Sequence, residues 1–368
     1  MNARRFLPRD TQELVRWYER FISPLALIGG FIADNLILLR RVDLWTTNAL
    51  LGFYLVASGM GILFLNAADA GRLKSDRLQR IVPFVPIIVQ FSIGGLFSGY
   101  LSLYSRSAAF AGSWVFVTVV ALLLLSNERF LRLYRRLVFQ VSLYFVVLYS
   151  FFIFVLPVLF KRIGADMFLL AGVVSVAITV AFSLGIGIIA PERMRAARVN
   201  ILATIAALAL LFNMLYFANL IPPLPLALKA GGIYHGVSRQ ADGTYTLSGE
   251  PVPWYESFLR YNLVFHKVPG ESAYVFTAIF APTGLMTTIV HQWQWYDSSS
   301  SAWKTTAEIP FDITGGRDGG YRGWSGKYDP MPGAWRVNVL TPSGQLITRL
   351  SFTVVDATSS PALVPSSL

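Results

Sequence analysis

A glycine-rich segment near the C-terminus, residues 315–327, carries the side chains best suited to binding a ligand. Two aromatic residues stand among three cations in this order: Arg317, Tyr321, Arg322, Trp324 and Lys327. An aromatic ring can stack on a sugar, and the cations can hold an acidic glycan or a lipid headgroup. A structural role is the alternative, with both rings covering the end of a β domain and the cations solvated. The glycines do not follow the phosphate-loop order, so no nucleotide site is expected.

The three histidines, His235, His266 and His291, all lie in the C-terminal part of the chain. Histidines can ligate zinc or copper, but these occupy separate segments without a close pair, so no metal site is expected. His291 shares a predicted strand face with Ile289 and Trp293, which favours a buried, hydrogen-bonded role. The chain contains no Cys, and neither a Ser-His-Asp order nor a Gly-x-Ser-x-Gly elbow stands out. We therefore expect no cofactor and identify no catalytic residue.

The elements that carry the first 221 residues are apolar helices. Seven stretches of about twenty residues hold no charged side chain or, in one case, a single Asp, and each is long enough to cross a bilayer. A hydrophobic fraction of 54% agrees with a protein that crosses the lipid bilayer several times. The stretches are residues 21–39, 44–65, 81–104, 108–126, 137–160, 167–190 and 199–221.

Basic residues alternate in number between these stretches. The N-terminal tail and the connections after the second, fourth and sixth stretches carry sixteen Lys and Arg, whereas the other three connections carry five. Because basic residues stay on the cytoplasmic side, the pattern predicts seven spans, a cytoplasmic N-terminus and an exported segment after residue 221. The net charge of +11 is explained by these loops and by anionic lipid, not by nucleic acid.

The N-terminal segment, residues 1–20, contains eight charged residues, which excludes a cleavable signal peptide. Asp10 and Glu13 have the spacing of a helix capping box. Leu14 and Trp17 follow on one face, which predicts a short cytoplasmic amphipathic helix in the headgroup layer.

Polar residues inside the apolar stretches are the candidates for a membrane pathway. Asp34 is the carboxylate within a predicted span, and Asn35 and Gln90 add further polarity. A structural alternative pairs Asp34 with Arg40, about 9 Å further along the helix axis, or exposes it to headgroup water. A transporter usually gathers several ionisable groups or contains broken helices in a repeat, and neither pattern is found here.

A ridge of small side chains runs along the sixth stretch. Its members stand four residues apart on one helix face: Ala171, Ser175, Thr179, Ser183 and Gly187. Such ridges let another helix approach closely. Gly95 and Gly99 repeat the pattern on a smaller scale. The ridge predicts packing within the seven-helix bundle, with an interface to another membrane subunit as the alternative.

The segment from residue 222 to 368 has strand periodicity instead. We expect strands at 273–280, 287–296, 303–313, 321–328, 334–340 and 345–355, with shorter ones near Tyr234 and Tyr245. About eight short strands in this length indicate an all-β, immunoglobulin-like sandwich. Residues 250–262 are expected as a short helix or a bridging loop. A flexible tail is expected from about residue 357.

Part of this segment resembles a known family. The order is His291-Gln292-Trp293, then GRDGGYRGWSGK at 316–327, PGAWRV at 332–337, Gly344-Gln345 and Phe-Thr-Val at 352–354. From about residue 282 to 356 the chain is therefore similar to the bacterial family catalogued as domain of unknown function 2914. The resemblance implies an envelope-facing module behind a multi-span region of the inner membrane, and it supplies no catalytic residue.

Three function classes stay open at this point. The first is a non-enzymatic inner-membrane protein whose periplasmic sandwich binds an envelope partner, either a protein subunit or a glycan. An aromatic, cation-bearing tail behind a membrane region without a polar pathway favours it. The second is a transporter or channel, suggested by Asp34 and the seven spans. The third is a membrane-embedded enzyme acting on a lipid-linked substrate, which needs two catalytic-type residues to converge at the outer face.

Overall fold

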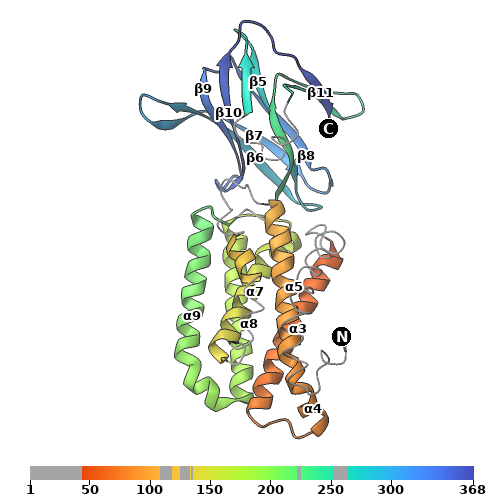
Figure 1. The fold of residues 1–368 in the computed structure, drawn as a ribbon, viewed down its shortest axis with the longest axis vertical. Coiled ribbons are helices and arrows are strands. Elements are labelled where there is room, and N and C mark those ends of the chain that lie inside the picture. The colour runs from red at the N-terminus through yellow and green to blue at the C-terminus, as the bar shows by residue number, and fades with distance from the viewer. Residues whose placement is uncertain (1–43, 108–117, 125–132, 134–135, 222–224, 252–262) are drawn as a thin grey trace, which may run out of the picture. The chain divides into compact units, whose positions relative to one another are not determined.

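The computed structural model describes residues 44–107, 118–124, 133, 136–221, 225–251 and 263–368 (Figure 1). The chain divides into two compact units, and the main boundary between them follows Leu220. The first unit is built from helices and the second from strands.

Long apolar helices make up the first unit. The helices are α3 (Trp45–Asp69), α4 (Asp76–Ile81), the 3-10 helix η4 (Val82–Phe84), α5 (Val85–Ser107), α7 (Leu137–Phe160), α8 (Ala165–Ile189) and α9 (Pro191–Phe217). Five helical segments are long and apolar enough to cross a membrane: α3, the run from α4 into α5, α7, α8 and α9. They coincide with five of the seven predicted spans.

Seven spans are therefore not supported by the described part of the chain. The predicted span at 21–39, together with Asp34, Asn35 and the amphipathic segment 1–20, lies outside the described residues. Most of the predicted span at 108–126 lies outside them as well, and residues 118–124 within it are helical.

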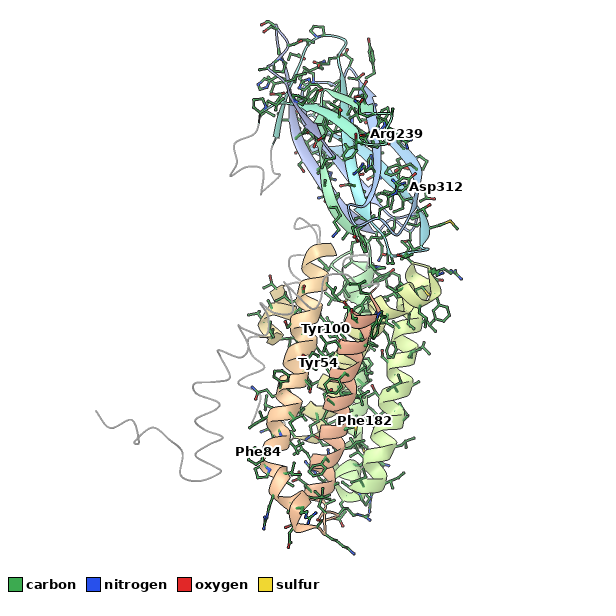
Figure 2. The ribbon with its side chains drawn as sticks, turned by 90° about the vertical axis from the view of Figure 1, so that its right-hand side faces the viewer. Tyr54, Phe84, Tyr100, Phe182, Arg239 and Asp312 are labelled. Atoms are coloured by element: carbon green, nitrogen blue, oxygen red, sulfur yellow. The ribbon has the colours of Figure 1, made fainter. Side chains whose placement is uncertain are left out.

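Glycines allow the helices to approach one another closely. A tyrosine ring from a neighbouring helix covers each of three glycines: Tyr54 over Gly95, Tyr144 over Gly59 and Tyr149 over Gly172. A Cβ atom at any of these glycines would lie 2.6 Å from a tyrosine atom. Figure 2 shows Tyr54 and Tyr100 among the helices, and the Tyr100 hydroxyl donates to the Val147 carbonyl at 2.7 Å, joining α5 to α7.

The predicted small-residue ridge lies on α8. Ala171, Ser175 and Thr179 are fully buried within the unit, and Ser183 and Gly187 are half-buried. The hydroxyl groups of Ser175 and Thr179 donate to backbone carbonyls one turn earlier, at 2.6 and 2.7 Å, so their polarity is satisfied locally. The buried half of the ridge thus packs inside the bundle, and an interface with another subunit stays a prediction.

Eleven strands form the second unit within the described residues. They are β1 (Ala227–Tyr234), β2 (Gly236–Arg239), β3 (Tyr245–Gly249), β4 (Leu263–Lys267), β5 (Ser272–Phe280), β6 (Met286–Asp297), β7 (Ala302–Thr314), β8 (Tyr321–Tyr328), β9 (Gly333–Leu340), β10 (Leu346–Asp356) and β11 (Val364–Ser367). Three sheets result, with the strand orders β1-β5-β8, β4-β10-β9-β6-β7 and β11-β3-β2. β4 pairs with β10 in parallel, and the other pairs are antiparallel.

The hydrophobic core lies between two of these sheets. One buried cluster combines Val275 of β5 with Phe265, Trp293, Trp335 and other side chains of the five-stranded sheet. Strand alternation contributes to it, since apolar residues such as Trp335 and Val337 recur at every second position and face the partner sheet. A smaller cluster around Leu247 joins the third sheet to the opposite face of β5. The C-terminal region is thus rich in β-structure, as predicted.

Two segments differ from the expectation. β4 was not predicted, because its five residues follow a segment whose sequence suggested a helix or loop; residues 252–262 of that segment lie outside the described ones. Part of the tail expected to be flexible forms β11, whose residues Val364–Ser367 pair with β3. β11 contains a proline and no strong alternation, so its partner strand, not its sequence, determines its conformation.

Candidate functional site

The predicted ligand-binding segment forms β8, an edge strand that pairs with β5. Side chains alternate along a strand, and Ser325 is buried and hydrogen-bonded to His291. The side chains of alternate parity therefore lie on the opposite, outer face: Arg322, Trp324 and Tyr328, with Gly326 between the last two.

Alternation separates the five candidate residues. Arg322 and Trp324 lie on the outer face, whereas Tyr321 and Lys327 lie on the face of the buried serine. Arg317 precedes the strand, and its Cζ atom is 5.8 Å from the centre of the Tyr321 ring. Lys327 donates from Nζ to a backbone carbonyl of β7 at 3.4 Å. The structure thus brings two pairs together instead of one five-residue cluster.

Three aromatic rings on the outer face form what we call the aromatic strip: Tyr274, Trp324 and Tyr328. Trp324 is 45% exposed and Tyr328 is 74% exposed. Tyr274 of β5 meets Trp324 edge-on, with ring centres 5.6 Å apart. Gly326 lies opposite Tyr274, and a Cβ atom there would be 3.0 Å from the tyrosine ring, so glycine leaves room for it.

Charged and covered surface borders the aromatic strip. Arg322 donates to the Gly243 carbonyl at 3.4 Å. Hydrogen bonds from the hydroxyl and backbone N–H of Thr244 lower the pKa of Asp242, and Arg322 adds a smaller effect. Further along the outer face, Phe276 is completely buried in the cluster with Leu247. The strip therefore lies beside a part of this sheet face that the third sheet covers.

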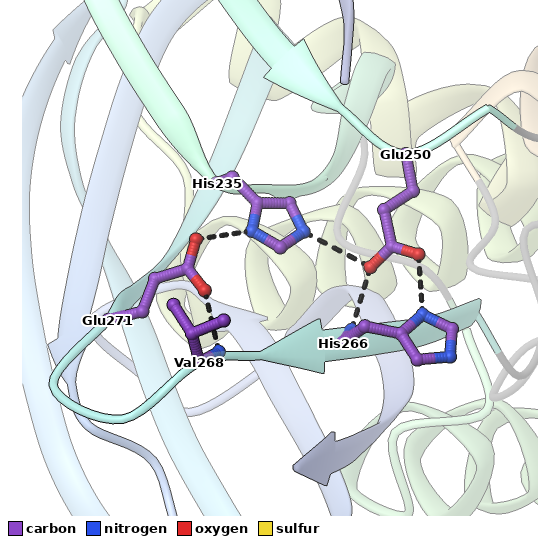
Figure 3. A network of polar contacts seen from close by, with 5 residues as sticks. All are labelled: His235, Glu250, His266, Val268 and Glu271. Atoms are coloured by element: carbon purple, nitrogen blue, oxygen red, sulfur yellow. Dashed lines mark hydrogen bonds and ion pairs between the residues drawn. The ribbon is translucent and has the colours of Figure 1, made fainter. Parts of the chain in front are cut away.

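A histidine–carboxylate network lies elsewhere in the β-rich region (Figure 3). His235 is almost fully buried and stacks on Phe265, with ring centres 4.1 Å apart. Its Nδ1 is 2.6 Å from Oε1 of Glu271, and its Nε2 is 3.1 Å from Oε1 of Glu250. Glu250 also accepts from the backbone N–H of His266 at 2.7 Å and contacts Nδ1 of that ring at 2.7 Å. Four ionisable side chains thus form one connected group.

The protonation of His235 is constrained by this geometry. A neutral imidazole has a single N–H, so both ring contacts are hydrogen bonds only with a second ring proton or a protonated carboxyl group. Burial raises the pKa of Glu250, but hydrogen bonds from His266 and His235 outweigh it and hold the pKa below its ordinary value. Both ring nitrogens of His235 thus lie within hydrogen-bond distance of a carboxylate oxygen.

Sequence reasoning missed this network because its members come from four segments. His235 follows β1, Glu250 follows β3, His266 lies in β4 and Glu271 precedes β5. His235 and His266 share a carboxylate, whereas His291 lies apart in the core. Within the described ranges, no three His, Cys, Asp or Glu side chains have an arrangement that could hold a metal ion. Recognising Leu263–Lys267 as a strand was the signal that could have placed His266 in this sheet.

The intramembrane candidate within the described residues is Gln90, which is buried in α5. Another buried amide pair joins two helices, since Asn66 of α3 donates to Gln140 of α7 at 2.8 Å. The hydrogen bond between Asn66 and Gln140 connects two helices, which is a packing role.

Among comparisons with known proteins, a family match is found for the C-terminal region. A solved structure of the Pseudomonas fluorescens alkylpurine DNA glycosylase AlkC, bound to DNA containing an abasic site analog, matches with 12% identity over 80% of this chain and 81% of that chain. The TM-score of 0.23 is too low to indicate a shared fold. No curated protein matches the chain. Residues 286–354, from the start of β6 into β10, match the family model described as "Protein of unknown function (DUF2914)", which confirms the resemblance for this region.

Proposed function

We propose that the chain is a non-enzymatic protein of the bacterial inner membrane that presents its β-rich region in the periplasm, where the region binds an envelope glycan. Seven spans, a cytoplasmic N-terminus and an immunoglobulin-like sandwich belong to this proposal. The five long apolar helices and the alternation of basic residues support the topology. The core that two sheets share supports the sandwich.

The aromatic strip is the observation that carries the glycan proposal. Trp324 and Tyr328 are exposed on one strand face, and Tyr274 supports the tryptophan edge-on. Trp324 and Tyr328 are four residues apart on β8, about 13 Å along the strand, and this spacing suits an extended polymer. Sugar rings offer apolar faces to such aromatics, and Arg322 beside them can donate to hydroxyl or carboxylate oxygens.

An envelope protein is the second candidate partner, because exposed aromatic residues with a neighbouring Arg also anchor protein interfaces. The transporter and enzyme classes depend on Asp34, which lies outside the described residues. No observation on the described helices favours either class over binding.

Sedimentation of the full-length protein in mild detergent with purified cell-wall sacculi tests the proposal. We expect Trp324→Ala or Tyr328→Ala to lower the bound fraction at least about fivefold. Met286→Ala is the matched control, because Met286 is 75% exposed on a different sheet, and it should bind like the wild type. Equal binding of all variants, or no binding at all, would exclude the glycan. Capture of an envelope protein that Trp324→Ala abolishes would support the second candidate.

A further inference from the structure

A ladder of polar side chains crosses the outer face of the five-stranded sheet. Its first row runs over four adjacent strands: Glu308 of β7, Gln292 of β6, Asn338 of β9 and Arg349 of β10. Buried Val337 and Val339 flank Asn338 in sequence and point to the core, so the row faces away from it.

Hydrogen bonds along this row run in one direction. Arg349 donates from Nε to Asn338 Oδ1 at 2.7 Å. Asn338 donates from Nδ2 to Gln292 Oε1 at 3.0 Å, and Gln292 donates from Nε2 to Glu308 Oε1 at 2.8 Å. The carboxylate therefore ends the row on one side, and a guanidinium ends it on the other.

A second row positions another guanidinium beside the first. Arg336 donates from Nε to Gln294 Oε1 at 2.7 Å, and its Cζ atom lies 4.1 Å from the centre of the Trp303 ring. Gln294 also accepts from Asn338 at 3.1 Å and donates to Thr305 Oγ1 at 3.0 Å. The amide oxygens of both rows are thus occupied, and each arginine is held through its Nε atom.

The terminal Nη groups of Arg336 and Arg349 have no hydrogen-bond or ion-pair partner within the described residues. Both side chains are half-buried. Burial and the charge of Arg349 lower the pKa of Arg336 to about 10, and burial lowers the pKa of Arg349. Both groups remain charged at neutral pH. Two cations are therefore held close together at a surface that offers donors and no free amide acceptor.

We propose that the Arg336–Arg349 pair binds a phosphate group. Two guanidinium forks suit a ligand with several acceptor oxygens and up to two negative charges, which a phosphate offers and a single carboxylate does not. Trp303 covers one face of Arg336 and leaves its edge for the ligand. This site lies on a different sheet from the aromatic strip and goes beyond the proposed glycan binding.

Calorimetric titration of the full-length protein in an uncharged detergent with inorganic phosphate tests the site. We expect Arg336→Gln or Arg349→Gln to weaken phosphate binding at least about tenfold. Arg336→Lys keeps the charge but loses the fork, so its affinity should be intermediate. The matched control is Arg239→Gln, which removes an exposed cation on β2 (Figure 2) and should stay within about twofold of the wild type.

A second measurement keeps the proposal testable if a glutamine variant fails to fold. Phosphate should raise the thermal unfolding midpoint of the wild type more than chloride or acetate at equal ionic strength, and Arg349→Lys should reduce that increase. Equal effects of the three anions, preference for acetate, or an equal loss in Arg239→Gln would overturn the proposal.

The source of the phosphate is distinguished by adding short-chain phosphatidic acid or phosphatidylcholine to the micelles. Arginine-dependent binding of phosphatidic acid, but not of free phosphate, identifies a lipid headgroup. Binding of free phosphate identifies a soluble phosphate or phosphoester. Absence of both excludes the site. Trp324→Ala should leave phosphate affinity unchanged, so failure of this site and failure of glycan binding are separable.

Discussion

The Nδ1 atom of His291 lies 2.8 Å from the Ser325 hydroxyl, and this contact joins β6 to β8 across the core of the β-rich region. The other ring nitrogen lies 2.9 Å from the hydroxyl of Thr277 on β5. Ser325 also accepts from the Trp293 indole at 2.9 Å. A completely buried imidazole therefore links two sheets through neutral hydroxyl groups, as expected of a structural histidine.

Acid should destabilise the β-rich region through this residue. Burial lowers the pKa of His291 from 6.5 to about 4. Between these values the unfolded chain binds more protons than the folded one, so the free energy of unfolding falls as the pH decreases. The full effect is about 3 kcal/mol. Denaturant unfolding followed by tryptophan fluorescence should give a flatter pH profile for His291→Gln than for the wild type.

The control for this measurement is Arg239→Gln, because Arg239 is exposed on β2 and takes no part in the His291 contacts. It should retain the wild-type decrease over the same pH range. An undiminished decrease in His291→Gln would contradict the assignment.

Replacing Gly315 should destabilise the same region for a steric reason. A Cβ atom there would lie 1.9 Å from the Pro282 carbonyl oxygen and 2.7 Å from that of Ala281. Backbone atoms cannot rotate away, so Gly315→Ala should cost about 3 kcal/mol of unfolding free energy. Gly319→Ala, four residues later, meets nothing within 4 Å and should change it by less than about 0.5 kcal/mol. Thermal unfolding compares the two, and equal midpoints would exclude the clash.

The sequence predicted the regular strands well because their alternation is strong. In β9, Trp335, Val337 and Val339 are buried and Arg336 is half-buried, which is the alternation of a strand with one face in the core. β8 has the predicted bounds. β10 departs from simple alternation at its start, because an irregularity between residues 346 and 348 turns Ile347 inward.

The candidate sites were less accessible to sequence reasoning. Trp324 and Arg322 were predicted as candidates, but Tyr274 joins them only through the pairing of β5 with β8. Arg336 and Arg349 are thirteen positions apart and meet through the register of β9 and β10. Long-range register depends on turns and bulges that period-two patterns do not encode.

His235 should contribute more to stability than His266. Its side chain is 2% exposed and separates two carboxylates, each less than one-fifth exposed. His235→Ala leaves Glu250 and Glu271 without their shared buried hydrogen-bond partner, so we expect a loss of about 3 kcal/mol. His266→Ala removes a contact at a half-exposed ring and should cost about 1 kcal/mol or less. Denaturant unfolding measures both, and equal losses would show that the buried ring is not the centre of the network.

The natural absence of Cys allows a direct test of the number of spans. Two single-cysteine variants are made, Lys74→Cys and Ser298→Cys. Lys74 lies in the exposed connection between α3 and α4, and Ser298 lies in the exposed turn after β6. Seven spans put five crossings between these positions and hence place them on opposite sides of the membrane. The four described apolar helices between them would put both on the same side if residues 108–126 did not cross. An impermeant maleimide should therefore label position 298 in intact spheroplasts, whereas position 74 should be labelled only after the membrane is permeabilised. Labelling of both positions, or of neither, in intact spheroplasts would contradict seven spans, because an odd number of crossings separates the two sides.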